Sequence, residues 1–232
     1  EQIDHDTCLL KGNVSRPLVA ERRAGATKPD EATEWLCLDV DGLPVNNADE
    51  FMDLIGFGDV SYVEQLSCSA GIDTERGYSA HIFVIIKEPA TPAELKVWLK
   101  DINLRLLREH VTLNKASTAL KWPLDISTCQ NDKLLYVAPP VCVGFAAPDV
   151  PRLRYVRKKY QRLPIDFSKV DKLSVSTDEK KCVNELRKAA GLRKKNYKYK
   201  GEVLLNPDRA EVTDYKRDRG FVYLNLNGGD SW

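Results

Sequence analysis

Apolar residues recur at alternate positions, or in short runs, in several parts of the chain that are predicted to be strands. These parts are residues 35–41, 61–69, 77–86 and 134–137. Period-two alternation and short apolar runs are typical of strands with one or two buried faces, and Pro139-Pro140 is placed to end the last one. The polar segment before residue 34 is predicted to be loop or short irregular structure.

Apolar residues spaced three and four apart predict helices elsewhere. One helix follows Asn47, a residue type that caps helix N-termini, and a second follows Thr91. The letters Thr91-Pro92-Ala93-Glu94 combine a capping box with Pro at the first helical position. The apolar stripe of the second helix comprises Leu95, Trp98, Leu99, Ile102 and Leu106. We expect this stripe to face the sheet, which assigns Trp98 to the core.

A third helix is predicted near the C-terminal end. Ser176-Thr177-Asp178-Glu179 repeats the capping-box spacing and would open it, and Gly191 would end it. Strand-like pieces follow at 203–205 and 221–226. Strands and helices mixed in this order predict an α+β fold.

The composition of the chain changes near residue 165. Residues 1–165 are predicted to form the main domain, and residues 166–232 an accessory lobe or a connector. Because the chain begins with Glu rather than Met and ends in a polar, Gly-containing segment, we expect it to be a piece of a longer protein.

Carboxylates interrupt the first predicted strand. Alternate side chains of a strand point to the same face, so Asp39 and Asp41 would stand side by side while Leu38 and Val40 are buried. Two like charges at this distance favour a divalent cation, and Mg²⁺ commonly binds one or two carboxylates together with substrate phosphates. A strand that runs into an Asp-Gly turn would give the same letters for local reasons. An EF-hand loop is disfavoured because Gly42 follows Asp41 directly.

Two further polar features accompany these carboxylates. Ser79 and His81 share a face of the strand at 77–86, and a hydroxyl and an imidazole are both suited to phosphate oxygens. A lone His on a strand is more often a core residue that has its hydrogen bonds satisfied. Asp125 lies in an apolar stretch, 120–127, and would either reach the same site or cap the next turn.

An Asp-x-Asp strand, a Ser-x-His strand and a later apolar-flanked Asp, in this order, resemble the three motifs of the archaeo-eukaryotic primase superfamily. The resemblance covers roughly residues 30–145, and its continuation over 125–140 is similar to primase-polymerases of phages, plasmids and integrated mobile elements. It implies a catalytic core with an RRM-like sheet joined to a second αβ unit. The implied activity is template-directed nucleotidyl transfer, by a DNA primase or a DNA-directed DNA polymerase.

The resemblance also implies roles for individual residues. Asp39, Asp41 and Asp125 would hold two Mg²⁺ or Mn²⁺ ions. Ser79 and His81 would bind the incoming nucleoside triphosphate, and Lys133 is offered as a further phosphate contact. Single-stranded or primed DNA would be the template, with a helicase domain or subunit as partner. Primer initiation and extension, and the preference for deoxynucleotides or ribonucleotides, stay open at this point.

Charge changes this picture through its distribution rather than its total. The chain has 35 Lys and Arg residues against 34 Asp and Glu, yet two runs, 150–164 and 186–201, contain basic residues and no acid. Tyrosines are interleaved with these charges, which is typical of a groove for single-stranded nucleic acid, although such runs are by default solvated faces. The predicted nucleic-acid contacts are Arg152, Arg154, Arg157, Lys158, Lys159, Arg193, Lys194, Lys195 and Lys198.

The cysteines and the hydropathy bear on the compartment. Six cysteines form no Cys-x-x-Cys pair, which indicates reduced thiols with neither a disulfide framework nor a recognisable zinc site. No run approaches the roughly 18 apolar residues of a membrane span, and the start lacks a signal-peptide pattern. We therefore expect a cytoplasmic protein without a membrane partner, in a bacterial, archaeal or phage-infected cell.

Two other functions fit part of the sequence. A non-catalytic nucleic-acid binding module of a replication protein would keep the acids only as structure. The letters Leu38-Asp39-Val40-Asp41-Gly42 also resemble the nucleophile motif of haloacid-dehalogenase-like phosphatases, in which the first Asp attacks phosphorus. In that family the motif normally lies near the domain start and the second acidic motif near its end. Here Gly58-Asp59 follows too soon, and Ser79 and His81 have no explanation.

Overall fold

The computed structural model describes residues 8–17, 23, 26–72, 74–144, 146, 148–192, 212–218 and 221–226. The chain divides into two compact units, Glu1–Lys195 and Asn196–Trp232. The strands of the first unit are β1 (Cys8–Leu10), β2 (Thr33–Leu43), β3 (Tyr62–Leu66), β4 (Tyr78–Ala90), β5 (Thr112–Leu113), β6 (Leu120–Lys121), β7 (Leu134–Tyr136) and β8 (Leu153–Val156). Its helices are α1 (Ala48–Leu54), α2 (Pro92–Arg105) and α3 (Lys172–Ala189), with 3₁₀ turns η2 (Thr74–Arg76), η3 (Arg108–His110), η4 (Ile126–Cys129) and η5 (Phe167–Lys169).

The main sheet has the strand order β2-β4-β3-β8, and every neighbouring pair is antiparallel. The strands predicted at 35–41, 61–69 and 77–86 are confirmed as β2, β3 and β4, and the α+β class is confirmed as well. The edge strand β8 was not predicted, because its arginines and exposed apolar residues follow no buried pattern. The second unit contains the antiparallel pair β9 (Val212–Asp218) and β10 (Phe221–Leu226), which confirms the predicted strand at 221–226. The piece at 203–205 lies outside the described residues.

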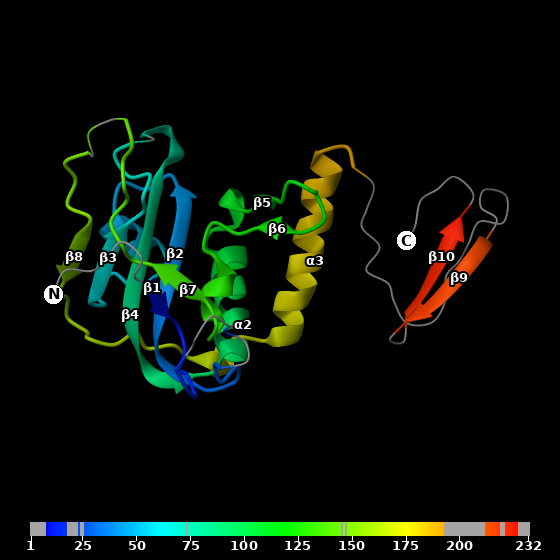
Figure 1. The fold of residues 1–232 in the computed structure, drawn as a ribbon, viewed down its shortest axis with the longest axis horizontal. Helices are drawn as coiled ribbons and strands as arrows, with labels where there is room; N and C mark the ends of the chain where they lie inside the picture. The colour runs from blue at the N-terminus through cyan, green and yellow to red at the C-terminus, as the bar shows by residue number, and fades with distance from the viewer. Residues whose placement is uncertain are drawn as a thin grey trace. The chain divides into compact units, whose positions relative to one another are not determined.

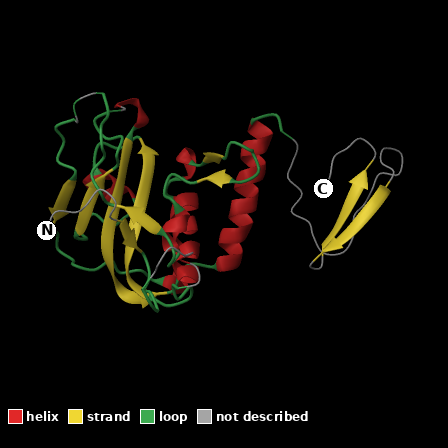
Figure 2. Ribbon diagram, viewed as in Figure 1, coloured by secondary structure: helices red, strands yellow, loops and turns green. Residues whose placement is uncertain are grey.

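Helices α1 and α2 cover one face of the main sheet, and the opposite, open face carries polar residues together with Trp35, Val63 and Phe83. The core combines Leu38 of β2 and Ile82 of β4 with Phe51 of α1 and Leu99 of α2, and all four are fully buried. The apolar stripe predicted for α2 is confirmed, and Trp98 is only 4% exposed. In Figure 2 the strands of the main sheet (yellow) lie to one side of helices α2 and α3 (red). Alternation along β2 and β4 therefore turns the remaining side chains to the open face.

The start of α3 was predicted wrongly. The helix begins at Lys172, and Asp171 is its N-cap, accepting hydrogen bonds from the backbone N–H groups of Leu173 and Ser174. Ser176–Glu179 lie inside the helix, where the Thr177 hydroxyl donates to the Leu173 carbonyl instead of capping. The predicted end is confirmed, because Gly191 follows the last turn with φ +70°. Figure 1 shows α2 between the sheet and α3, which contacts α2, β5 and β6.

The first described strand, β1, pairs with β7 in an antiparallel two-stranded sheet. This strand was not predicted, whereas β7 agrees with the prediction at 134–137. The neighbouring Lys11 is buried, and its Nζ donates to Thr33 Oγ1 and lies 5.1 Å from the centre of the Trp35 ring. All six cysteines lie in the described residues and none is disulfide-bonded. Within the described helices, none combines the length and apolar character needed to span a membrane.

Candidate active site

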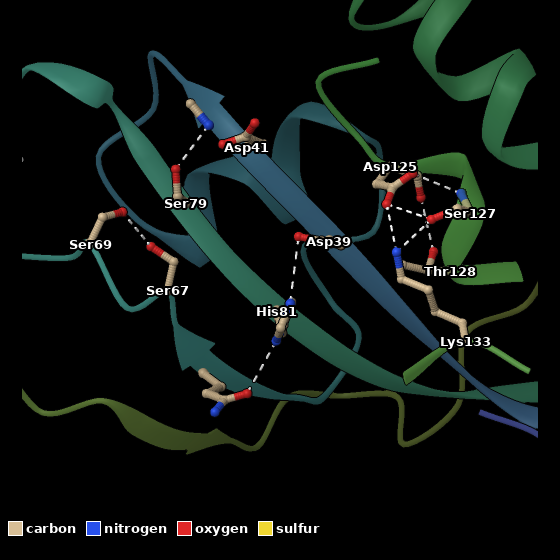
Figure 3. Close-up of polar contacts among 12 residues, drawn as sticks. Asp39, Asp41, Ser67, Ser69, Ser79, His81, Asp125, Ser127, Thr128 and Lys133 are labelled. Atoms are coloured by element: carbon tan, nitrogen blue, oxygen red, sulfur yellow. Dashed lines mark hydrogen bonds and ion pairs between the residues drawn. The ribbon is translucent and has the colours of Figure 1, made fainter. Parts of the chain in front are cut away.

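A row of polar side chains crosses the open face of the main sheet. Asp39 on β2 is the register partner of His81 on β4, and His81 is the partner of Gln65 on β3. The imidazole bridges its neighbours: Nδ1 is 3.2 Å from Gln65 Oε1, and Nε2 is 3.7 Å from Asp39 Oδ1. Figure 3 shows Asp39 and His81 directed toward each other across the two strands. The antiparallel register thus brings together two residues predicted from separate motifs.

Asp125 joins the row from the other side of β2. Its backbone N–H donates to the Asp39 carbonyl (2.9 Å), and the Asp41 N–H donates to the Pro123 carbonyl (2.9 Å). A bridge between Val40 and Leu124 completes this short antiparallel pairing. The main-chain hydrogen bonds therefore hold Asp125 next to Asp39, although 85 residues separate them in the sequence.

Asp41 and Ser79 lie farther along the same face, beside a bulge. The β2–β4 register shifts between Val40 and Leu43, where Gly42 has φ +73°. The Gly42 N–H donates to Ser79 Oγ at 2.9 Å, so this hydroxyl helps to fix the bulge. Added atoms would not fit at Gly42, because a Cβ there would lie 2.9 Å from the Arg76 carbonyl oxygen.

These side chains line one cleft of about 430 Å³. Its walls comprise Asp39, Val40, Asp41, Ser67, Arg76, Ser79, Lys121, Trp122 and Asp125. The cleft thus brings together four of the residues predicted for the site: Asp39, Asp41, Ser79 and Asp125. His81 lies beside the cleft through its contact with Asp39. We call this space the acid cleft.

The three carboxylates differ in how far ion pairs and hydrogen bonds compensate their negative charges. Asp41 pairs with Arg76 (Nη2 to Oδ1, 2.6 Å) and with Lys121 (Nζ to Oδ2, 3.7 Å). Asp125 accepts hydrogen bonds from the Ser127 N–H (2.8 Å), from Ser127 Oγ (2.6 Å) and from Lys133 Nζ (3.1 Å). It is also the N-cap of η4, which confirms the turn-capping role predicted for it.

Asp39 is the least compensated of the three. Burial and then the charge of Asp125 raise the pKa of Asp39 to about 6, with Lys133 opposing and Asp41 adding to the effect. Burial also acts to raise the pKa of Asp125, but its hydrogen bonds from Ser127 and the charge of Lys133 lower that pKa overall. The pKa of His81 is lowered, first by burial and then by Lys133. His81 is therefore neutral at pH 7, and its contact with Asp39 is not an ion pair there.

The carboxylates suit a cation whose remaining ligands come from phosphates or water. They do not suit a structural metal site in which protein side chains supply every ligand. Within the described residues, no three His, Cys, Asp or Glu side chains form a group able to hold a metal ion by themselves. Mg²⁺ needs only one or two carboxylates when phosphates and water supply its remaining ligands. Asp39 and Asp125 are suited to this, because each contributes to the electrostatic strain that a cation would relieve.

The predicted nucleic-acid contacts on the first basic run have varied surroundings. Arg152 donates to the carbonyls of Ser67 (2.8 Å) and Ala70 (3.2 Å). Arg154 binds Glu64 and Lys158 binds Asp49. Arg157 and Lys159 are exposed, and the Lys159 ammonium lies 4.9 Å from the centre of the Tyr160 ring. Arg193, Lys194, Lys195 and Lys198 lie outside the described residues.

Sequence reasoning missed several residues of the site. Arg76 and Lys121 are the basic residues that pair with Asp41, and Gln65 binds His81. Gln65 has a usable signal, since it is a polar residue within the apolar β3 stretch. Arg76 has a weaker one, since it closely precedes Ser79 in the chain.

Comparisons of the chain with protein-family models, with curated proteins and with solved structures gave no match.

Proposed function

We propose that this protein is a nucleotidyltransferase that copies a DNA template, of the primase-polymerase type that its three motifs resemble. The observation that carries the proposal is the row Asp125–Asp39–His81, which joins one residue from each motif through strand register and main-chain hydrogen bonds. Each residue lies far from the others in sequence. A chance occurrence of the three short motifs would not require them to meet on one sheet face.

The proposed roles follow from the chemistry of the side chains. Asp39 and Asp125, with Asp41 nearby, would hold Mg²⁺ or Mn²⁺, which in such sites activates the attacking hydroxyl and stabilises the leaving pyrophosphate. The neutral imidazole of His81 and the hydroxyl of Ser79 would donate hydrogen bonds to the triphosphate. Arg76, Lys121 and Lys133 place three positive charges around the acid cleft, which suits the remaining phosphate charge. A nucleoside triphosphate, a single-stranded or primed template and a helicase partner belong to this proposal.

A non-catalytic nucleic-acid binding module is the second candidate, and one observation favours it. Arg76 and Lys121 already neutralise Asp41, and Lys133 already pairs with Asp125. A site that had lost its chemistry would keep such internal ion pairs for stability alone. The proposals differ at Asp39, whose raised pKa is a cost to the fold that a purely structural role does not explain.

Nucleotide incorporation tests the proposal directly. The protein would be incubated with labelled nucleotides and Mg²⁺ or Mn²⁺, on a primed template and on an unprimed single strand. Product from the primed template alone would indicate a polymerase, and product from both would indicate a primase. Asp39→Asn should abolish incorporation by removing a cation ligand. Asp30→Asn, which changes an exposed carboxylate, is the matched control and should retain full activity.

Three outcomes would contradict the proposal. Absence of product on both templates, with oligonucleotide binding retained, would favour the binding module. Incorporation that is unchanged in Asp39→Asn would place the chemistry elsewhere. Release of phosphate from a generic phosphomonoester such as p-nitrophenyl phosphate, lost in Asp39→Asn, would instead identify the phosphatase.

A further inference from the structure

A second and larger hollow adjoins the acid cleft on the open face of the sheet. Its volume is about 1000 Å³, and Ser67 and Arg76 line both spaces. The main sheet forms its floor through Val63, Gln65, His81 and Phe83. The segment from Tyr136 to Pro140 forms another wall. We call this hollow the apolar groove.

The groove is aromatic and apolar, with polar groups at defined places. The Trp35 and Phe83 rings lie side by side on its floor, with centroids 6.2 Å apart and planes tilted by 36°. Tyr136 lines the groove yet is 71% exposed, which means that its ring is not needed to fill the core. Gln65 and His81 lie at the end that meets the acid cleft. Exposed aromatic residues in a concave site commonly mark a binding surface.

We propose that the apolar groove binds unpaired bases of the template strand by stacking. The inference rests on the proposed function, and it assigns the bases of the strand to this surface, at whose edge lies Arg152 of the first basic run. A volume of about 1000 Å³ is at the upper end for a single small ligand, which leaves space for more than one base. Sheet faces that carry aromatic residues bind two or three bases in other nucleic-acid modules.

The charges around the groove support a nucleic acid over an apolar peptide. Arg152 lines the groove, and its guanidinium binds the Ser67 and Ala70 carbonyls, so no carboxylate neutralises it in these contacts. Arg76 lies where the groove meets the acid cleft. Each can approach a phosphate while bases lie on the aromatic floor. The groove also ends beside Asp39 and His81, so a base that leaves it arrives where the proposed reaction takes place.

Binding of a fluorescent ten-nucleotide oligo-dT to the full chain, followed by anisotropy without metal or nucleotide, tests this inference. Tyr136→Ala should weaken binding by roughly 5- to 150-fold, the range for loss of one stacked base. The loss should be the same at low and high salt, because stacking involves no charge. Tyr136→Phe should keep most of the affinity. Tyr160→Ala, an exposed tyrosine of the basic run outside the groove, is the matched control and should bind normally.

Two further ligands in the same experiment distinguish stacked bases from other molecules that could occupy the groove. An abasic oligomer of the same length should bind at least tenfold more weakly, because its phosphates remain while its bases are gone. Unchanged binding of oligo-dT by Tyr136→Ala, or equal binding of the abasic oligomer, would overturn the inference. Displacement of oligo-dT by a deoxynucleoside triphosphate at equimolar concentration would assign the groove to the incoming nucleotide and would overturn it as well.

The failure of this inference is distinguishable from failure of the proposed function. An inactive protein whose oligonucleotide binding depends on Tyr136 would refute the transferase and leave the groove assignment. An active transferase whose template binding is indifferent to Tyr136 would refute only the groove assignment.

Discussion

Carboxylates and basic residues meet on both faces of the main sheet, with opposite results. On the helix-covered face, Glu64 accepts hydrogen bonds from Arg154 Nε (2.8 Å) and from the Tyr78 hydroxyl (2.6 Å). Beside it, Lys158 Nζ lies 2.7 Å from Asp49 Oδ1. The pKa of Asp49 is lowered, first by its hydrogen bond from Lys158. We call these residues the Glu64 network, and its charges compensate one another.

The acid cleft on the open face compensates Asp41 and Asp125 with basic residues but leaves Asp39 without a cationic partner among the described ion pairs. Asp39 has a pKa raised to about 6 by burial and by neighbouring carboxylates, and the side chain facing it is a neutral imidazole whose Nε2 lies 3.7 Å from Asp39 Oδ1. Residue type alone therefore does not separate a structural ion network from a candidate functional site. The distinguishing feature is whether folding alone satisfies each charge, or whether an external cation is needed.

The largest expected effect is the loss of the Glu64 network. Glu64→Ala should reduce the free energy of unfolding by about 3 kcal/mol, because it leaves the buried Tyr78 hydroxyl without its acceptor and Arg154 with only its longer pair to Asp49 (3.6 Å). Urea denaturation would measure the change. Glu34→Ala is the matched control, since its ion pair with Arg162 is exposed and long (3.8 Å) and should contribute at most about 1 kcal/mol. A loss below 1 kcal/mol for Glu64→Ala would remove the contrast between the two faces.

Asp39→Asn should act in the opposite direction. A carboxyl whose pKa rises from 3.8 to about 6 on folding destabilises the fold when ionised, by up to roughly 3 kcal/mol. The cost is fully present above pH 6 and disappears as the pH falls below about 4. The variant should therefore gain about 2 kcal/mol in urea denaturation at pH 8 and nothing at pH 4. A loss of stability at pH 8 would show that Asp39 is structurally compensated like Glu64.

Cation binding should depend on the same ionisation. Asp39 must lose its proton to bind Mn²⁺, so affinity should fall as the pH drops through about 6, by up to tenfold per pH unit. Calorimetric titration of Mn²⁺ at pH 7.5, 6 and 5 measures this. His81→Gln should retain the dependence, because it removes only the imidazole's own protonation. A pH-independent affinity over this range would contradict the raised pKa of Asp39.

The smallest expected effect concerns the basic run at 150–164. Arg157 and Lys159 are exposed and, in the described contacts, pair with no carboxylate, in contrast to Arg154 and Lys158. If both contact phosphates, the Arg157→Gln, Lys159→Gln variant should lower the slope of log affinity against log salt by about 1.4, at roughly 0.7 per contact. The matched control is the exposed pair on α3, Lys172→Gln with Lys180→Gln, which should leave the slope unchanged. An unchanged slope in both variants would make the run a solvated face.

Local patterns were sufficient to predict the faces of β2 and β4 but not their alignment. Alternation places Asp39 and His81 on the polar faces of their strands, and this is confirmed. Which residue lies opposite which depends on a register set by the whole core, and the bulge at Gly42 shifts it again. The position of Asp125 beside Asp39 depends on main-chain bonds across 85 residues, for which no local pattern exists.

Two other misses have physical causes. The letters Ser176–Glu179 satisfy the capping-box pattern, yet Asp171 caps α3 a full turn earlier because it accepts two N–H groups at once. The pairing of Arg76 with Asp41 joins a turn to a strand, and long side chains can reach partners that periodicity does not identify. Predictions about the residues from 193 to 201 lie outside the described part of the chain.

The segment that carries Asp125 also determines where the sheet ends. Without residues 123–125, β2 would present unpaired N–H and C=O groups to solvent, and such edges promote edge-to-edge aggregation. Pairing through the carbonyls of Asp39 and Pro123 covers part of this edge, and Pro123 has no N–H with which to recruit another strand. The same short stretch thus supplies a carboxylate to the acid cleft and covers part of an edge that would otherwise be open to a further strand. We expect selection on solubility to constrain its sequence independently of any selection on catalysis.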